Sequence, residues 1–112
     1  MTPIEMAGKL GFEGVHEGEG ASREIAGIYC CDLLSIVMGR AKADDCWITV
    51  MANVNTVAVA VLADVACVVL SEGMSLDDTA LEKARAQNVC VLKTDRPTFE
   101  TALAVQKQME QS

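Results

Sequence analysis

An unbroken run of six apolar residues at positions 65–70 (VACVVL) constrains the fold most strongly. A strand with one face in water alternates apolar and polar side chains, whereas a strand of a covered parallel sheet is apolar throughout. Residues 89–92 (VCVL) repeat this pattern, and residues 46–51 (CWITVM) form another β-rich segment. These segments predict a buried sheet that is mostly parallel.

Helical patterns separate the predicted strands. Asp32 is placed to cap a helix over about residues 33–42, whose last turn carries the cations Arg40 and Lys42, which the helix dipole favours. Residues 54–63 predict a second helix, capped by Asn53 or Asn55. Because it is apolar on every face, we expect it to be buried on all sides.

Two more helices follow further along the chain. One begins with a capping box at Ser75 and Asp78, in which each side chain satisfies a main-chain N–H of the first turn. The last begins at residues 95–98 and is expected to turn Phe99, Leu103 and Val105 toward the core.

The N-terminal part continues the alternation. Residues 2–10 predict a short helix, residues 12–16 and 24–30 predict strands, and the Gly- and Glu-rich segment between those strands predicts a flexible loop. The order of elements, with short right-handed connections, predicts an α/β fold. We expect a mixed, mostly parallel sheet of about five strands with helices on both faces.

The length of 112 residues fits one domain spanning residues 1–112. Its core is expected over about residues 10–105, with a polar, frayed tail at residues 107–112. No segment has the pattern of a signal peptide or of a membrane span, so we expect a cytoplasmic protein without a membrane partner. A net charge of −7 and scattered basic residues argue against nucleic acid as a partner.

The residue patterns of common catalytic sites are missing from the sequence. It has neither a phosphate loop ending in Gly-Lys-Ser/Thr nor a Gly-x-Ser-x-Gly turn, and its one histidine, His16, falls in the acidic loop. Five cysteines without a CxxC pair predict neither a disulfide framework nor a zinc site. We expect a protein that is not an enzyme and that needs no cofactor or metal.

Polar residues occur where a predicted strand ends and the next predicted helix begins. The carboxyl ends of parallel strands meet at one edge of a sheet, where ligands collect and helix N-termini offer N–H groups. Plain capping is the alternative role of such residues, and we favour it for Asp32 and Asp95. The candidate ligand-binding residues are Asp32, Ser35, Asn53, Asn55, Thr56, Thr94 and Asp95.

Cysteine pairs can carry redox chemistry, and Cys30 and Cys31 are adjacent. If one thiol were exposed with a lowered pKa, the pair could serve a redox role. The remaining cysteines lie in apolar strand segments and are expected to act as small core hydrophobes.

Residues 31–39 (CDLLSIVMG), 47–50 (WITV) and 53–60 (NVNTVAVA) resemble the DRTGG domain family. The segments at residues 70–73 and 91–99 fit the same pattern, so the resemblance covers about residues 10–105. It implies a fold like the N-terminal domain of HPr kinase and a regulatory role beside CBS domains, phosphotransacetylases or kinases. It also implies that stand-alone members accompany iron-only hydrogenase and redox-sensing proteins.

Two departures from the family limit what carries over. The Asp-Arg-Thr-Gly-Gly string is absent, and the nearest text is residues 94–97 (TDRP). The catalytic half of HPr kinase is absent too, so a kinase label would describe ancestry. The sequence therefore predicts a regulatory module, expected as a homodimer, that binds a small ligand such as a nucleotide or a partner protein. The alternative is a redox or iron–sulfur accessory protein that uses Cys30 and Cys31.

Overall fold

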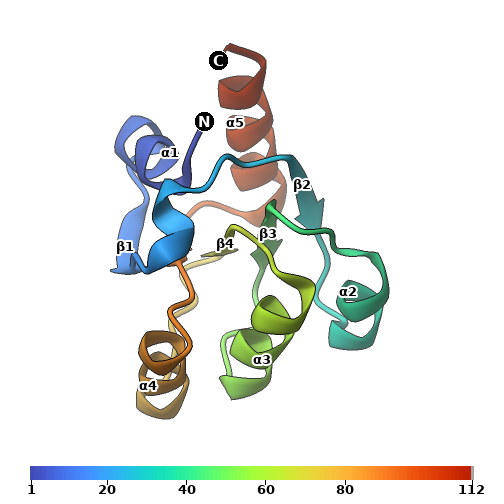
Figure 1. Cartoon of the computed structure of the whole chain (residues 1–112). Coiled ribbons are helices and arrows are strands. Elements are labelled where there is room, and N and C mark those ends of the chain that lie inside the picture. The colour runs from blue at the N-terminus through green and yellow to red at the C-terminus, as the bar shows by residue number, and fades with distance from the viewer. Residues whose placement is uncertain (112) are drawn as a thin grey trace.

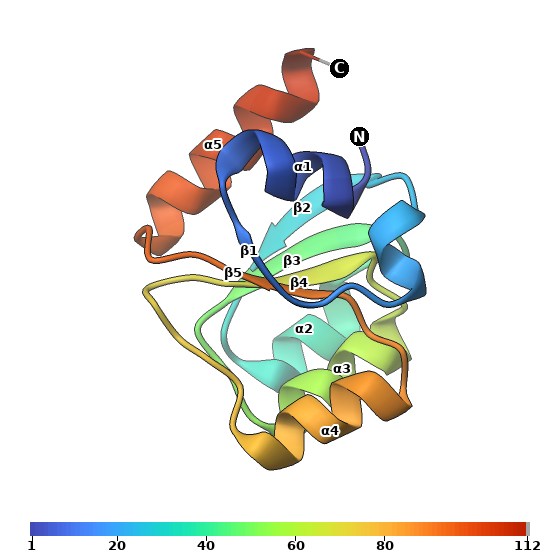
Figure 2. The same ribbon diagram turned by 90° about the vertical axis from the view of Figure 1, so that its left-hand side faces the viewer.

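A five-stranded sheet lies between two layers of helices in the computed structural model, which describes residues 1–111 (Figures 1 and 2). The elements are α1 (Pro3–Leu10), β1 (Glu13–His16), the 3-10 turn η1 (Glu19–Ser22), β2 (Gly27–Cys30), α2 (Leu34–Arg40), β3 (Asp45–Thr49), α3 (Val54–Ala63), β4 (Cys67–Leu70), α4 (Asp78–Ala86), β5 (Val91–Lys93) and α5 (Thr98–Gln111). The strand order is β1-β5-β4-β3-β2.

The four strands β2 to β5 are parallel, and β1 joins the sheet antiparallel to β5. Helices α2, α3 and α4 cover one face, while α1 and α5 cover the other (Figure 2). Three consecutive crossovers step in the same direction across the sheet, which places their helices on one face. The predicted mixed, mostly parallel sheet with helices on both faces is confirmed.

Successive side chains of each central strand point to opposite faces of the sheet and pack into two separate hydrophobic cores. Cys46 and Ile48 of β3 pack toward α1 and α5, whereas Trp47 between them packs toward α2, α3 and α4. The Trp47 side chain is fully buried, and its indole N–H donates to the main-chain oxygen of Cys31 at 2.9 Å. Burial on both faces explains why these strands are apolar throughout.

Several helix faces differ from the sequence-based expectation. Helix α3 is not buried on all sides, because Leu62 is 69% exposed on the outward side of a single helix layer. In α5, Phe99 is 74% exposed and Leu103 also faces outward, while Thr101 and Val105 lie against the sheet. Thr101 tolerates burial because its hydroxyl donates to the main-chain oxygen of Pro97 at 2.9 Å.

Two predicted caps are also wrong. Leu33 occupies the N-cap of α2 without a side-chain cap, because the Asp32 carboxylate turns instead toward the end of β3. Asp77, rather than Ser75, caps α4 and accepts from the main-chain N–H of Ala80 at 2.8 Å. Helix α1 begins with a capping box that was not predicted, in which the Thr2 hydroxyl oxygen accepts from the Glu5 N–H and the Glu5 carboxylate accepts from the Thr2 N–H.

The Gly- and Glu-rich segment is packed, contrary to the flexible loop expected from its composition. It forms η1, in which Gly20 is buried so close to β4 that an added Cβ would lie 2.1 Å from the Ala66 oxygen. The His16 ring, expected in solvent, is half-buried and makes a 2.8 Å hydrogen bond between Nδ1 and the Val89 oxygen.

The polar end of the chain is helical through Gln111, so α5 continues past Lys107, where fraying was expected. Residue Ser112, the last of the predicted tail, lies outside the described residues. Within residues 1–111, none of the helices has the length and apolar character needed to span a membrane.

Candidate functional site

The carboxyl ends of β2, β3, β4 and β5 meet at one edge of the sheet, here called the carboxyl-terminal edge. Most of the candidate residues predicted from the sequence follow these strand ends directly or begin the helix beyond them. Their contacts decide which of them hold the fold together and which remain available to a ligand.

Asp32 fastens the end of β2 to the end of β3. Its Oδ1 accepts from the hydroxyl of Thr49 at 2.7 Å and from the main-chain N–H of Val50 at 2.9 Å. Thr49 is fully buried, and its hydroxyl oxygen accepts in turn from the Met51 N–H at 3.1 Å. The carboxylate therefore serves the packing of this edge.

Asn53 caps α3, as one of the two predicted alternatives. Its side-chain oxygen accepts from the main-chain N–H groups of Asn55 at 2.9 Å and Thr56 at 3.2 Å. The buried Thr56 hydroxyl donates to the Met51 oxygen at 2.9 Å. The exposed side chains of Asn55 and Ser35 have no hydrogen-bond partner among residues 1–111, which leaves both available.

Thr94 and Asp95 lie on the β5 side of the edge. The Thr94 hydroxyl oxygen accepts from the Arg96 N–H at 3.3 Å. Asp95 is exposed and makes no side-chain hydrogen bond within the described part of the chain. Both residues line a recess of about 520 Å³ together with residues of the α1–β1 turn and of β5.

The cations of that recess are already engaged. Lys93 donates to the Ser75 hydroxyl at 2.9 Å and forms an ion pair with Glu13 at 3.1 Å. Arg96 donates to the Leu10 oxygen at 3.1 Å, and its guanidinium lies 5.8 Å from the centre of the Phe12 ring. This recess therefore offers a ligand little unsatisfied positive charge.

Three residues at the same edge were not predicted from the sequence. The Glu72 carboxylate accepts from the main-chain N–H of Thr98, at the start of α5, at 2.8 Å. The buried Ser71 hydroxyl forms a hydrogen bond of 2.7 Å with the Thr98 hydroxyl. The partners in each pair are more than 25 residues apart in the sequence, so local sequence patterns could not predict these hydrogen bonds. Ser71 directly follows β4, so the rule of polar residues at strand ends was the available signal.

The predicted candidates form two separate clusters. Asp32 and Asn53 are linked through Thr49, Met51 and Thr56, whereas Thr94 belongs with the loop after β5. The structure thus brings the β2 and β3 residues together and leaves Thr94 and Asp95 apart from them.

The thiols of Cys30 and Cys31 point to opposite sides of the sheet. Cys30 is exposed and pairs in register with Ile48, which faces α5, while Cys31 packs with the core under α2 and α3. The Cys30 residue is exposed, but its sulfur is partly shielded from water, and this desolvation, together with the nearby Cys46 and Asp32, raises the pKa of the thiol. A raised pKa lowers the fraction of the nucleophilic thiolate at Cys30.

The other three cysteines lie side by side within the core between the sheet and α1 and α5. Cys46 and Cys67 are register partners, and all three thiols are almost fully buried. The hydrogen bond to Cys46 and burial raise the pKa of Cys67, and burial raises that of Cys90 to about 12. They act as small core hydrophobes, and no group of three or more metal-ligating side chains occurs in residues 1–111.

Comparisons with known proteins agree on one family. The model of the DRTGG domain matches residues 5–108. Among curated proteins, none matches the chain. One similar solved structure contains the CBS and DRTGG domains of the regulatory region of Clostridium perfringens pyrophosphatase, complexed with the activator diadenosine tetraphosphate.

That structure superposes with a TM-score of 0.70 at 14% sequence identity, which demonstrates a shared fold. The alignment covers 94% of this chain and 44% of the other, so this chain spans less than half of the regulatory region. Because the family model matches nearly the whole length of the chain and the fold agrees with that of a solved DRTGG-containing structure, the chain belongs to the DRTGG domain family.

Proposed function

We propose that this chain is a non-catalytic regulatory module that binds a small ligand, with nucleotides as the first candidates, or docks on a partner protein. The observation that supports a binding role is the state of the carboxyl-terminal edge. Most of its hydroxyls and carboxylates are engaged in short internal hydrogen bonds, whereas the Asn55 amide and the Ser35 hydroxyl have no partner among residues 1–111 and face solvent.

Catalysis would need a group poised to exchange protons or attack a substrate. The hydroxyls of Thr49 and Ser71 are buried in fixed bonds, and the His16 ring is held by the Val89 oxygen away from this edge. A hydrogen-bonded edge that leaves one outward amide, Asn55, and one outward hydroxyl, Ser35, suits recognition better than bond making. Nucleotides come first because the similar regulatory region was solved with a dinucleotide activator.

A thermal-shift screen against nucleotides, phosphorylated metabolites and metal ions tests this proposal. A ligand at about a hundred times its Kd stabilises the folded chain by roughly 2.7 kcal/mol, which a melting curve detects. We expect at least one nucleotide to raise the Tm. If no compound of the panel raised the Tm, the proposal that the chain binds a small ligand would be contradicted, and docking on a partner protein would be left.

The variant Asn55→Ala locates the site. Because the Asn55 side chain has no hydrogen-bond partner among the described residues, its loss should leave the Tm of the free chain nearly unchanged and reduce the ligand-induced shift. Gln87→Ala, at the far end of the helix layer, is the matched control. If both variants kept the full shift, Asn55 would have no part in binding.

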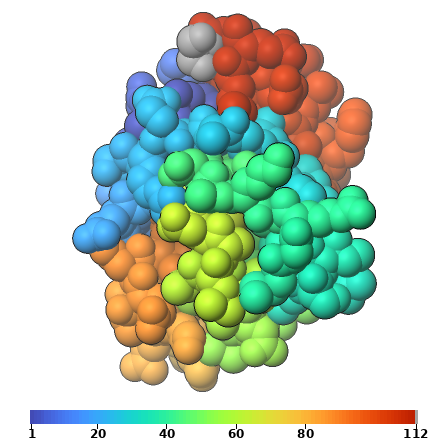
Figure 3. All heavy atoms as spheres, turned by 45° about the vertical axis from the view of Figure 1, so that its right-hand side comes forward, coloured from blue at the N-terminus to red at the C-terminus, as the bar shows by residue number. Residues whose placement is uncertain are grey.

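A homodimer is the second element of the proposal. Large apolar side chains are exposed on the outward sides of α2 and α3, whose surfaces adjoin in Figure 3. Such patches support association with a second copy. They comprise Leu33, Ile36, Met38, Val61 and Leu62. Light scattering at micromolar concentration should give twice the chain mass, and a monomer there would contradict this element.

The redox or iron–sulfur accessory role remains the alternative, favoured by one observation, the exposure of Cys30. Its raised pKa and its separation from the Cys31 thiol weigh against it. Rapid alkylation of Cys30 by iodoacetamide at neutral pH would favour the alternative, and slow alkylation would count against it.

A further inference from the structure

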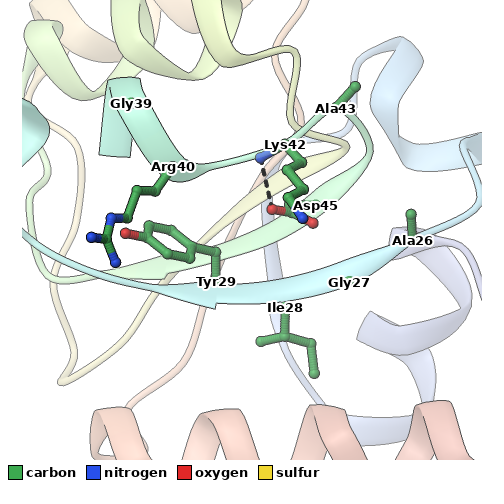
Figure 4. A pocket seen from close by; sticks show the side chains of 9 residues that line it. All are labelled: Ala26, Gly27, Ile28, Tyr29, Gly39, Arg40, Lys42, Ala43 and Asp45. Carbon is green, nitrogen blue, oxygen red and sulfur yellow. Dashed lines mark hydrogen bonds between the residues drawn. The ribbon is translucent and has the colours of Figure 1, made fainter. Parts of the chain in front are cut away.

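A recess of about 670 Å³ lies along the outer edge of the sheet, away from the carboxyl-terminal edge (Figure 4). Strand β2 is the last strand of the sheet and has a neighbour, β3, on one side only. The recess is formed between β2, the end of α2 and the loop that enters β3. Its volume falls in the range of about 300–1,000 Å³ that is usual for small-ligand pockets.

The main chain of β2 supplies donors to this recess. The Ala26 N–H donates to the Asp44 oxygen at 2.9 Å, so the main-chain groups of Ala26 face β3. Main-chain groups of alternate residues point to the same side of a strand. The N–H and C=O groups of Gly27 and Tyr29 therefore both face outward, and the Asp45 Oδ1 lies next to Gly27.

Two cations flank these donors. Arg40 and Lys42 are exposed, and neither side chain forms an ion pair or hydrogen bond with any residue from 1 to 111. By contrast, Arg23, Lys93 and Arg96 are each held by carboxylates or main-chain oxygens. Arg40 and Lys42 both line the recess, so two cations without an ion pair among the described residues lie beside the outer edge of β2.

The remaining polar side chains of the recess are Tyr29 and Asp45, and Asp45 is the one acidic residue that lines it. Figure 4 shows Tyr29, Arg40, Lys42 and Asp45 on one side of β2, with the Arg40 guanidinium beside the Tyr29 hydroxyl. Desolvation and the nearby Cys31 raise the pKa of Tyr29, while Arg40 acts in the opposite direction. Asp45 is 8% exposed, and its Oδ2 accepts from the Lys42 N–H at 2.9 Å, which fixes the loop that carries this cation.

We propose that this recess binds the phosphate group of a small ligand through Arg40, Lys42 and the outward N–H groups of β2. A phosphate group carries more than one charge on several oxygens, so it can satisfy two cations and main-chain donors together. A single carboxylate satisfies fewer of them. The inference goes beyond the proposed function, because this site shares no residue with the carboxyl-terminal edge.

Isothermal titration with sodium tripolyphosphate and with ATP, at low ionic strength, tests the proposal on the full chain. The double variant Arg40→Gln/Lys42→Gln should weaken both ligands by about a hundredfold, roughly tenfold for each cation lost. Arg85→Gln/Lys107→Gln is the matched control, since it makes the same charge change at exposed positions on α4 and α5. We expect the control to bind nearly as tightly as the parent chain.

Equal affinity for the two ligands would mean that phosphate alone is recognised, and tighter ATP would mean that the nucleoside adds contacts. The proposal is overturned if neither ligand binds the parent chain, or if the control loses as much affinity as the recess variant. Amide NMR shifts add a second readout. They should move at Gly27 and Tyr29, whereas shifts centred on Asn55 would refute this site and leave the proposed edge site standing.

Discussion

Asp32 is expected to stabilise the junction between β2 and β3 through one oxygen atom. That atom, Oδ1, accepts both from the Thr49 hydroxyl at 2.7 Å and from the Val50 N–H at 2.9 Å. Bonds to charged groups contribute about 1.5–3 kcal/mol each, but Asp32 is exposed and water can replace part of them. Asp32→Ala should therefore lower the free energy of unfolding by about 2 kcal/mol.

Asp32→Asn separates the geometry from the charge. Its side-chain oxygen can still accept both bonds, so we expect a loss below about 1 kcal/mol. Urea unfolding measures both values from the midpoint at an unchanged slope. Asp95→Ala, at an exposed carboxylate without a partner among the described residues, should change stability by less than about 0.5 kcal/mol. Equal losses for the alanine and asparagine variants, or no loss for either, would refute the single-oxygen clamp.

Two further predictions concern close packing and buried thiols. Gly20→Ala should destabilise the chain by about 2–3 kcal/mol, because the added Cβ collides with the Ala66 oxygen. At Gly8 an added Cβ meets no other atom, so Gly8→Ala should stabilise α1 by roughly 0.5–1 kcal/mol. Thermal unfolding of the two variants measures both changes. The pKa of Cys90 rises from 9.0 in the unfolded chain to about 12 in the folded chain. Below about pH 9 the thiol is protonated in both states, and its contribution to the free energy of unfolding is complete. As the pH rises toward 12, only the unfolded chain loses the proton, so the free energy of unfolding falls by about 1.4 kcal/mol per pH unit. Urea melts between these pH values should show this fall, and it should be shallower in Cys90→Ala; the same slope in both chains would contradict the prediction.

The strands and their order of connection were predictable because their signals are local. An apolar run such as residues 65–70 indicates a doubly covered strand by itself, and Asn53 precedes α3 within a few residues. The buried face of α5 was not predictable, because Thr101 is accommodated through its hydrogen bond to Pro97 while the apolar Phe99 faces solvent.

The site contacts depend on sheet register, which a single sequence does not specify. Asp32 meets Thr49 across 17 positions, and Glu72 meets Thr98 across 26. Arg40 and Lys42 were recognised from the sequence as cations at a helix end. Their lack of an acidic partner beside the outer edge of β2 became visible only once that strand was placed last in the sheet.

The most direct test of a binding role without bond making is a phosphorus NMR time course of ATP with equimolar protein and magnesium ions. We expect the ATP resonances to shift or broaden on mixing and the nucleotide to remain chemically intact overnight. Steady conversion to ADP and phosphate by the purified chain, lost in a variant of the carboxyl-terminal edge such as Asn55→Ala, would contradict the account.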